Sequence, residues 1–472
     1  MDFTFIILGI CLLIVLAFEF VNGMNDTANA VAPVIYSHSL DPKRSVLVAA
    51  ILNFFWVLFW GIAVAMSIIH LLPLSTIVSQ PTSFGIILVI SILISAIIWD
   101  LWAWYLALPV SSSHALIGSI LGISITLMFI PAWADTIPHW GKAQEVIIGL
   151  LISPIIGFGF AFFLIYIAHS ILRKKSYFKA PKTEDDHPTF AMRSVLIISS
   201  ALVSFMHGKN DWQKWVGIAT LILITLLPGY FAINPDIDFK NLNNDIQIIE
   251  KTLTQINPES LSEKEKEQLL ETTSQLAELK TLSEKAELST TEKVTLRSSI
   301  LHIQDNYKFM NTSKKITFIE NTYAGEGSEI INLNWIQKNI NNLSQATDYV
   351  PWWIILLVSI AIGSGTMIWW KRIVRTIGEK IGKHKMNYSQ AASSALITAG
   401  TIGIASSFGL PVSTTHVMSS SVAGTMVEEH GWKWGVDPHM IKHILLAWVL
   451  TMPITIILAG SIFFVLQFIF LK

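Results

Sequence analysis

Long apolar runs alternate with short polar segments over most of the chain. A helix needs about 20 mainly apolar residues to cross the hydrocarbon core of a bilayer, and most of the runs reach that length. The pattern therefore predicts an all-α polytopic membrane protein. Polar residues gather inside two runs, near 22–29 and near 207–214, and we expect the helix to be interrupted there. The ten runs are 3–36, 45–70, 84–108, 112–130, 145–171, 194–230, 350–370, 388–408, 412–428 and 441–470.

One polar motif occurs twice, as Leu-Pro-Val-Ser-Ser-Ser-His at 108–114 and as Leu-Pro-Val-Ser-Thr-Thr-His at 410–416. Proline lacks an N–H and suits the first turn of a helix, and hydroxyl side chains cap free backbone donors. Each motif therefore predicts a helix that begins inside the membrane, at the tip of a broken helix or hairpin. Whether each hairpin crosses the whole bilayer stays open at this point.

The tips of these two hairpins are expected to bind an anion. A helix N-terminus offers free N–H groups and the positive end of the helix dipole. The alternative is that the hydroxyl groups only hold neighbouring helices together. Two copies in matching places favour a binding site, because paired helix breaks are typical of a transporter's substrate site. The candidate substrate-binding residues are Ser111, Ser112, Ser113, Ser413, Thr414 and Thr415.

A second motif is also repeated, as Gly-Met-Asn-Asp at 23–26 and as Gly-Lys-Asn-Asp at 208–211. The first copy ends 83 residues before Pro109. The second ends 81 residues before Pro411, once the polar stretch 231–349 is left out. The spacing indicates that the two halves of the chain share one plan.

This spacing predicts one transmembrane repeat at 1–172 and a second made of 194–230 and 350–472. We expect the first repeat to cross the membrane an odd number of times, which makes the two repeats inverted. In such transporters substrate and coupling ion sit near the shared interface, at the membrane midplane.

Basic residues assign the sides of the membrane. They crowd the loops at 173–193 and 371–385, which are therefore expected in the cytoplasm. Counting crossings from these loops places both termini and the 231–349 insert in the periplasm. The insert is rich in Glu, Lys, Leu and Ser at helical spacing, so a helical extramembrane segment is expected there. A role as a lid and a passive role both stay open.

Composition agrees with a membrane protein and excludes other classes. Hydrophobic residues make up 52% of the chain and charged residues 14%, and the net charge of −1 gives no reason to expect a nucleic-acid partner. Cys11 is the only cysteine, which excludes an internal disulfide and a cysteine-rich metal site. The first residues lack a basic leader and a cleavage site, so we expect a retained first helix.

Ionisable residues at membrane depth indicate a functional site, because each costs at least about 2.5–3.5 kcal/mol on insertion scales. Asp26 and Asp211 occupy equivalent positions and each follows an Asn. A carboxylate with amide carbonyls suits a hard cation, and a carboxylate can also carry a proton. The alternative is a pair of helix caps. The candidate coupling-ion or proton residues are Asn25, Asp26, Asn29, Asn210 and Asp211.

Lys214 stands where the first repeat has Asn29. Its charge is expected to help neutralise an anion at the hairpin tips and to repel sodium beside Asp211. Secondary candidates, for ion relay or for plain interhelical hydrogen bonding, are Glu19, Asp100 and Lys209. The histidines near the motifs, His114, His207 and His416, are expected to orient hydrogen bonds rather than to carry protons.

These motifs, in this order, resemble the signatures of the inorganic phosphate transporter (PiT) family, in particular its bacterial low-affinity branch. The resemblance covers almost the whole chain except the insert. It implies phosphate symport with a cation, hydroxyl-rich tips on the phosphate and the Asn-Asp motifs on the coupling ion. It also implies a homodimer in a bacterial inner membrane, proton coupling, and phosphate carried as a neutral complex with a divalent metal. Other members use sodium.

Three alternatives remain at this stage. A sulfate or other oxyanion permease fits the same cradle, although sulfate has no proton to donate to Asp26 or Asp211 at neutral pH. Sodium-coupled phosphate symport fits the same scaffold. An enzyme acting on phosphate esters is disfavoured, because Ser113 and His114 are adjacent and adjacent residues on a helix point apart. No cofactor and no fixed metal site are expected.

Overall fold

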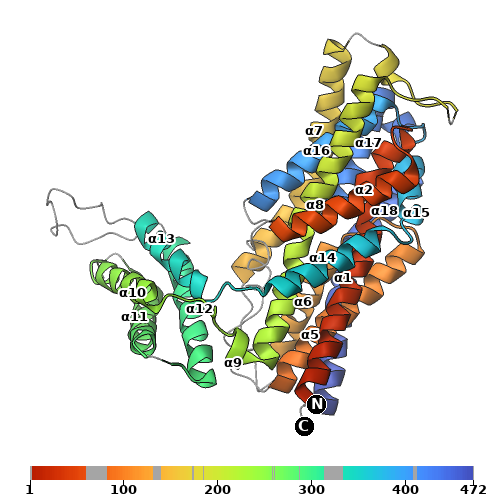
Figure 1. Cartoon of the computed structure of the whole chain (residues 1–472). Helices are drawn as coiled ribbons and strands as arrows, with labels where there is room; N and C mark the ends of the chain where they lie inside the picture. The colour runs from red at the N-terminus through yellow and green to blue at the C-terminus, as the bar shows by residue number, and fades with distance from the viewer. Residues whose placement is uncertain are drawn as a thin grey trace. The chain divides into compact units, whose positions relative to one another are not determined.

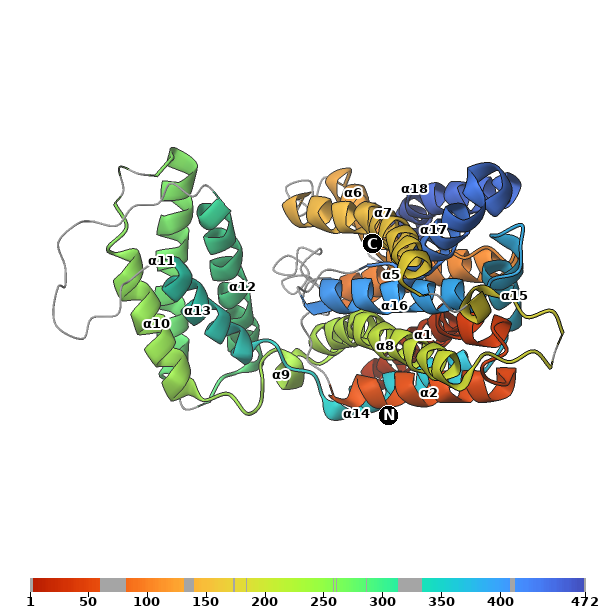
Figure 2. The same cartoon turned by 90° about the horizontal axis from the view of Figure 1, so that it is seen from above.

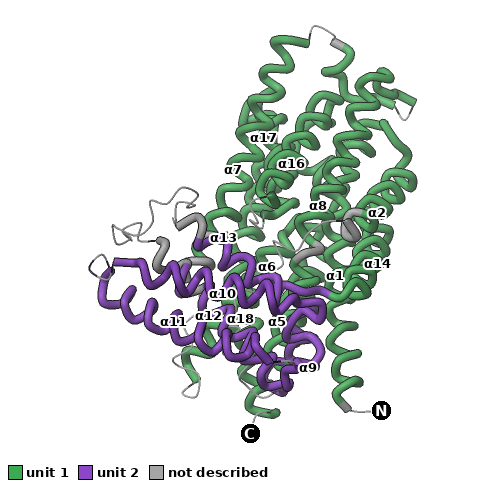
Figure 3. Tube along the Cα trace, turned by 60° about the vertical axis from the view of Figure 1, so that its left-hand side comes forward, with its two compact units in different colours: residues 1–73, 86–219, 351–472 green, residues 74–85, 220–350 purple. Residues whose placement is uncertain are grey.

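The structure is a computed structural model, in which the described residues are 3–59, 82–130, 140–172, 175–183, 185–257, 259, 261–285, 287–312, 333–407 and 412–470. The chain divides into two compact units, which Figure 3 colours separately. Unit 1 comprises 1–73, 86–219 and 351–472, and unit 2 comprises 74–85 and 220–350. Each unit is described by itself.

The described parts of the predicted apolar segments are mainly helical, with turns or extended residues at some of their ends, which confirms the all-helical, multi-span membrane fold (Figure 1). Residues 60–70 of the second segment lie outside the described residues. Among those described, five helices are long and apolar enough to span a membrane, or six if the bent pair α14 and its continuation at 371–380 count as one. The helices are α1 (Phe3–Tyr36), α2 (Pro42–Phe59), α5 (Thr82–Tyr105), α6 (Ser112–Met128), α7 (Trp140–Ile171), α8 (Phe190–Leu226), α14 (Trp352–Thr366), α15 (Lys371–Arg375), α16 (Tyr388–Ser407), α17 (Thr414–Gly435) and α18 (Pro438–Phe470).

The expected interruptions inside the first and sixth segments are wrong. α1 is helical through 22–29 and α8 through 207–214. The polar side chains there bond mainly to side chains of other helices, so the backbone keeps its own ladder of hydrogen bonds. Thr27 adds a bond from its hydroxyl to the carbonyl of Gly23, one turn earlier in the same helix. A cluster of Asn and Asp at membrane depth therefore did not require an unwound backbone.

Helix breaks occur instead at the two hydroxyl-rich motifs. α5 ends at Tyr105 and α6 begins at Ser112, where the Ser111 side chain caps the backbone N–H of His114 at 3.2 Å. Ser413 caps the N–H of His416 in the same way at 3.1 Å. The residues just before the second break, 408–411, lie outside the described part. In the first motif Pro109 precedes the cap rather than occupying the first helical position, so the serine defines the helix start.

The helix that follows each break packs against the last long helix of the other half. α6 packs along α18, and α17 along α7 (Figure 2). Two glycines allow the close approach, because a Cβ on Gly122 would meet the backbone of Ile456 and a Cβ on Gly424 would meet the backbone of Phe158. The two halves of unit 1 are therefore interlocked.

Unit 2 is built from short amphipathic helices around its own apolar core, which includes Ile246, Leu279, Ile300 and Ile340. A reciprocal capping box between Ser262 and Glu265 starts the charged helix α11. The unit contains α9 (Pro228–Phe231), α10 (Phe239–Leu253), α11 (Glu263–Ser283), α12 (Thr290–Thr312) and α13 (Leu333–Leu343).

One buried arginine, Arg297, connects the chain segment that enters the insert to the segment that leaves it. The Nη1 of Arg297 donates to the carbonyls of Ala232 and Thr347, at 3.0 and 2.9 Å. Burial lowers the pKa of Arg297 to about 10, which leaves the side chain charged at neutral pH. The arginine therefore holds together the start and the end of the insert.

Candidate functional site

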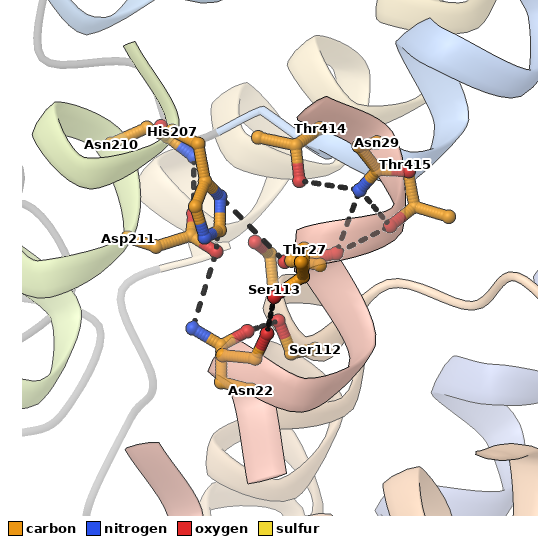
Figure 4. A network of polar contacts seen from close by, with 12 residues as sticks. Asn22, Thr27, Asn29, Ser112, Ser113, His207, Asn210, Asp211, Thr414 and Thr415 are labelled. Carbon is orange, nitrogen blue, oxygen red and sulfur yellow. Dashed lines mark hydrogen bonds and ion pairs between the residues drawn. The ribbon is translucent and has the colours of Figure 1, made fainter. Parts of the chain in front are cut away.

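Polar side chains from four helices of unit 1 meet in one buried cluster, which Figure 4 shows from close by. α1 and α8 contribute carboxylates and amides, and the N-termini of α6 and α17 contribute hydroxyls. All of them are less than a tenth exposed. The sequence-predicted residues from all four motifs are thus brought together.

The carboxylate of the first half is bonded to the hydroxyl tip of the second half. Asp26 Oδ1 accepts hydrogen bonds from Thr415 Oγ1 at 2.6 Å and from Asn29 Nδ2 at 2.9 Å. Asn29 Nδ2 also reaches Thr415 Oγ1 at 2.9 Å and Thr414 Oγ1 at 3.4 Å. An anion at the Thr414 and Thr415 hydroxyls therefore has Asp26 as a direct neighbour.

The second half repeats this arrangement on the first half's tip. Lys214 Nζ lies 2.5 Å from Asp211 Oδ1 and donates to the hydroxyl of Ser113. Ser112 Oγ donates to Asn22 Oδ1 at 2.6 Å, and Asn22 Nδ2 reaches Asp211 Oδ2 at 3.4 Å. Each hydroxyl tip is thus joined to the carboxylate-bearing helix of the opposite half. Thr415 bonds directly to Asp26, and Ser113 is connected to Asp211 through Lys214.

His207 lies between the two carboxylates. Its Nδ1 is 3.5 Å from Asp211 Oδ2 and 3.9 Å from Asp26 Oδ2. The three side chains are buried, and their ligand atoms lie within 4.8 Å of one another, an arrangement able to hold a metal ion. The sequence predicted only an orienting role for His207. Its position four residues before Asp211, on the same helix face, was the available signal.

Other candidates lie at the margin of this cluster. Asn25 Nδ2 donates to the backbone carbonyl of Asp100 at 3.4 Å, and Asn210 Nδ2 to Asp211 Oδ1 at 2.6 Å and the carbonyl of Val412 at 2.9 Å. Glu19 accepts a bond from Asn22 at 3.4 Å. Lys209 differs from the rest, since its Nζ donates to Ser407 near the end of α16, at 3.0 Å.

The charges of the cluster do not balance among its own side chains. Glu19, Asp26, Asp100 and Asp211 are all buried, and the buried Lys214 forms an ion pair with Asp211. Unpaired charge in a low-dielectric setting is costly. The cluster therefore favours cations or protons at the carboxylates.

The histidines that end the two hydroxyl motifs pack on each other. The rings of His114 and His416 have centroids 4.4 Å apart, and His416 stacks on Trp448 at 3.9 Å. An apolar groove of about 620 Å³ between α7, α17 and α18 runs past both rings, beside the polar cluster rather than within it. The hydroxyl of Ser113 accepts a bond from Lys214 and is not paired with the adjacent His114.

Comparisons with known proteins give one consistent result. The model of the phosphate transporter family matches residues 22–459. The chain is 36% identical to a low-affinity inorganic phosphate transporter of Buchnera aphidicola, over 97% of this chain and 96% of that protein. It is 35% identical to the low-affinity inorganic phosphate transporter PitB of Escherichia coli, over 98% and 97%.

A solved structure shares the fold. It is described as the sodium-dependent phosphate transporter, with a TM-score of 0.56 and 20% sequence identity, covering 98% of this chain and 99% of that one. The family model spans most of the chain, and the relatives exceed a third identity over nearly their full length. The chain therefore belongs to the phosphate transporter family.

Proposed function

We propose that the protein imports inorganic phosphate across a bacterial inner membrane by symport with protons. The observation that carries the proposal is the buried cluster in which two hydroxyl tips and two carboxylates are bonded across the halves of the chain. The names of the relatives, low-affinity inorganic phosphate transporters, support the same substrate. As a member of a transporter family, the protein is not an enzyme.

Phosphate is the oxyanion that these groups suit best. Ser112, Ser113, Thr414 and Thr415 offer hydroxyl donors, and Lys214 offers positive charge to an anion. Asp26, bonded to Thr415, offers an acceptor for a P–O–H group. Protonated phosphate can donate such a bond at neutral pH and sulfate cannot, so the site should discriminate against sulfate.

Proton coupling rests on the asymmetry between the halves. Asn29 has its counterpart in Lys214, whose ammonium group lies 2.5 Å from Asp211. A fixed positive charge at that place repels a bound sodium ion. The remaining buried carboxyl groups, with Asp26 first and Glu19 and Asp100 as secondary candidates, stay available to cycle a proton.

The inverted-repeat organisation also belongs to this proposal. The reciprocal packing of α6 on α18 and of α17 on α7, and the reciprocal bonds of the two tips, are what two inverted repeats produce. In this account 173–193 is cytoplasmic, and both termini and the insert are periplasmic. A homodimer, and a divalent metal carried with phosphate as a neutral complex, complete the proposal.

Competition uptake tests the substrate. Purified protein in proteoliposomes should take up labelled phosphate. At saturating phosphate, a tenfold excess of unlabelled phosphate should reduce the labelled uptake about tenfold, whereas the same excess of sulfate should leave most of it. Equal competition by both anions would favour the alternative, a general oxyanion permease. Release of phosphate from an ester by the purified protein would contradict a pure transport function.

A further inference from the structure

We propose that Asp26, His207 and Asp211 bind the divalent metal that travels with phosphate, and that the His207 nitrogen makes the site prefer transition metals to magnesium. The metal is cargo, and phosphate occupies its remaining coordination position. This inference rests on the proposed function and names the metal class of its substrate.

The spacing of the three ligand atoms fits a metal with little adjustment. Zinc bonds of 2.0–2.2 Å place two ligands of a tetrahedral site about 3.3–3.6 Å apart. His207 Nδ1 lies 3.5 Å from Asp211 Oδ2 and 3.9 Å from Asp26 Oδ2. The two carboxylate oxygens lie within 4.8 Å of each other, so closing the set on a metal needs side-chain shifts only, and the fourth position is left for an oxygen of phosphate.

Each carboxylate divides its two oxygens between two tasks. Asp211 Oδ1 is taken by Lys214 and Asn210, and Asp26 Oδ1 by Thr415 and Asn29. In both residues the oxygen that faces His207 is the other one, Oδ2. Oδ2 of Asp211 also accepts a long bond from Asn22 Nδ2, at 3.4 Å. The protein therefore holds both carboxylates in place through Oδ1 and presents one oxygen of each to the same point.

The imidazole of His207 gives independent evidence that a metal ion binds at this place. The ring is 1% exposed, and neither of its nitrogens has a hydrogen-bond partner among the residues that the structure describes. A buried polar group without a partner is costly. A metal bound at Nδ1 satisfies that nitrogen and separates two like charges. It lies on the Oδ2 side of Asp211, whereas the Lys214 ammonium group that repels sodium lies on the Oδ1 side. The competing explanation is a protonated imidazole shared by the two carboxylates.

The phosphate site adjoins the metal site at both carboxylates. Thr415 bonds to Asp26, and Ser113 is joined to Asp211 through Lys214. A phosphate at these hydroxyls lies beside a metal between the carboxylates, so the two are carried as one complex. Glu19, a secondary candidate for the coupling proton, is connected through Asn22 to Asp211 and Ser112.

The ligand types set the preference among metals. Magnesium and calcium take oxygen ligands, whereas imidazole suits zinc, copper, iron and nickel. A site with one nitrogen and two carboxylate oxygens should therefore take zinc more tightly than magnesium. Replacing the nitrogen by an oxygen should reduce or reverse that order.

Binding of radioactive zinc to the purified protein, without phosphate, gives the direct test. The wild type should bind zinc, and His207→Asn should bind it at least tenfold more weakly. His187→Asn removes an exposed loop histidine and controls for adventitious zinc, so it should match the wild type. Unchanged zinc affinity in His207→Asn, at an unchanged elution volume and melting temperature, would overturn the proposal.

Uptake of phosphate with each metal separates this proposal from the proposed function. In wild-type proteoliposomes zinc should support half-maximal uptake at a lower concentration than magnesium. In His207→Asp, which keeps a charged oxygen ligand, magnesium should support uptake and the advantage of zinc should fall at least tenfold. An advantage of zinc that survives in His207→Asp would contradict the metal assignment, with phosphate transport itself intact. Absence of phosphate uptake by the wild type with either metal would contradict the proposed function instead.

Discussion

At the scale of single residues, the halves of the chain are joined by a few bonds from hydroxyl groups. Ser112 and Ser113 contact residues of α1 and α8, while Thr414 and Thr415 contact Asn29 and Asp26. The sequence predicted these residues from two repeated motifs. It did not predict that each tip reaches the carboxylate-bearing helix of the opposite half. A sequence repeat shows which positions are equivalent, but it does not show which residues are in contact.

Removal of one hydroxyl at either tip should weaken phosphate uptake. Ser112→Ala and Thr414→Ala each lose a donor to a charged ligand, which is worth about 1.5–3 kcal/mol, or roughly 10- to 150-fold in apparent affinity. Initial rates of labelled-phosphate uptake at varied concentration measure this. Ser124→Ala is the control, since that hydroxyl bonds only to the preceding turn among the contacts seen, at Ile120. Wild-type kinetics in either tip variant would remove that residue from the site.

The carboxylate of Asp26 should be indispensable for accumulation. Asp26→Asn keeps the shape, but an amide takes up no proton and offers less charge to a cation, so gradient-driven uptake against a concentration difference should disappear. Steady-state accumulation ratios in vesicles report this. If the ratio stays at the wild-type value, coupling does not pass through Asp26, and Glu19→Gln and Asp100→Asn become the variants to measure.

The position of His207 between the two carboxylates could not be predicted from the sequence. Nothing in the motif distinguishes an orienting histidine from a ligand, because the difference depends on the distances to Asp26 and Asp211, from two different helices. Lys209 lies two residues from Asp211 along α8, and its ammonium group is bonded to Ser407 of α16. Nearness in sequence to Asp211 did not predict this partner.

At the scale of helices, the apolar pattern predicted the segments and their order, with ends that differ from the observed ones by a few residues. The prediction of breaks inside the first and sixth segments was wrong, since α1 and α8 are continuous helices through their polar clusters. Sequence shows polar side chains at membrane depth, but their partners decide whether the backbone must open. Here Ser112, Thr415 and other side chains supply those partners.

The close helix pairs depend on glycine. Gly122→Ala would place a Cβ against the backbone of Ile456, where a side-chain rearrangement gives no relief. We expect a loss of about 1–3 kcal/mol of stability, as for other overpacked sites, seen as a lower melting temperature in detergent. Gly159→Ala is a matched control on α7, because its Cβ would meet nothing within 4 Å. If Gly122→Ala has the same melting temperature as the control, then α6 and α18 can move apart without loss of stability.

At the scale of the whole molecule, the first described helix begins and the last one ends at the same end of unit 1 (Figures 1 and 3). That both termini face the periplasm stays a prediction from the basic loops. The sequence also predicted a polar helical insert at 231–349, and the described helices of that segment have their own apolar core.

The predicted sidedness can be tested with reporters. An enzyme reporter that works only in the cytoplasm should be silent when fused at residue 290 or after Lys472, and active when fused in the loop at 173–193. A periplasm-specific reporter at the same three positions should give the opposite pattern. Cytoplasmic activity at residue 290 in a protein that still transports phosphate would overturn the topology.

The most direct test of the central account is phosphate uptake driven by one gradient at a time. In proteoliposomes, an imposed proton gradient without sodium should drive accumulation by the wild type, and a protonophore should abolish it. A sodium gradient with the proton gradient clamped at zero should drive none, because Lys214 repels sodium beside Asp211. Lys214→Asn should lose proton-driven uptake and gain some response to sodium. Sodium-driven accumulation by the unmodified protein, with no proton gradient present, would contradict the account.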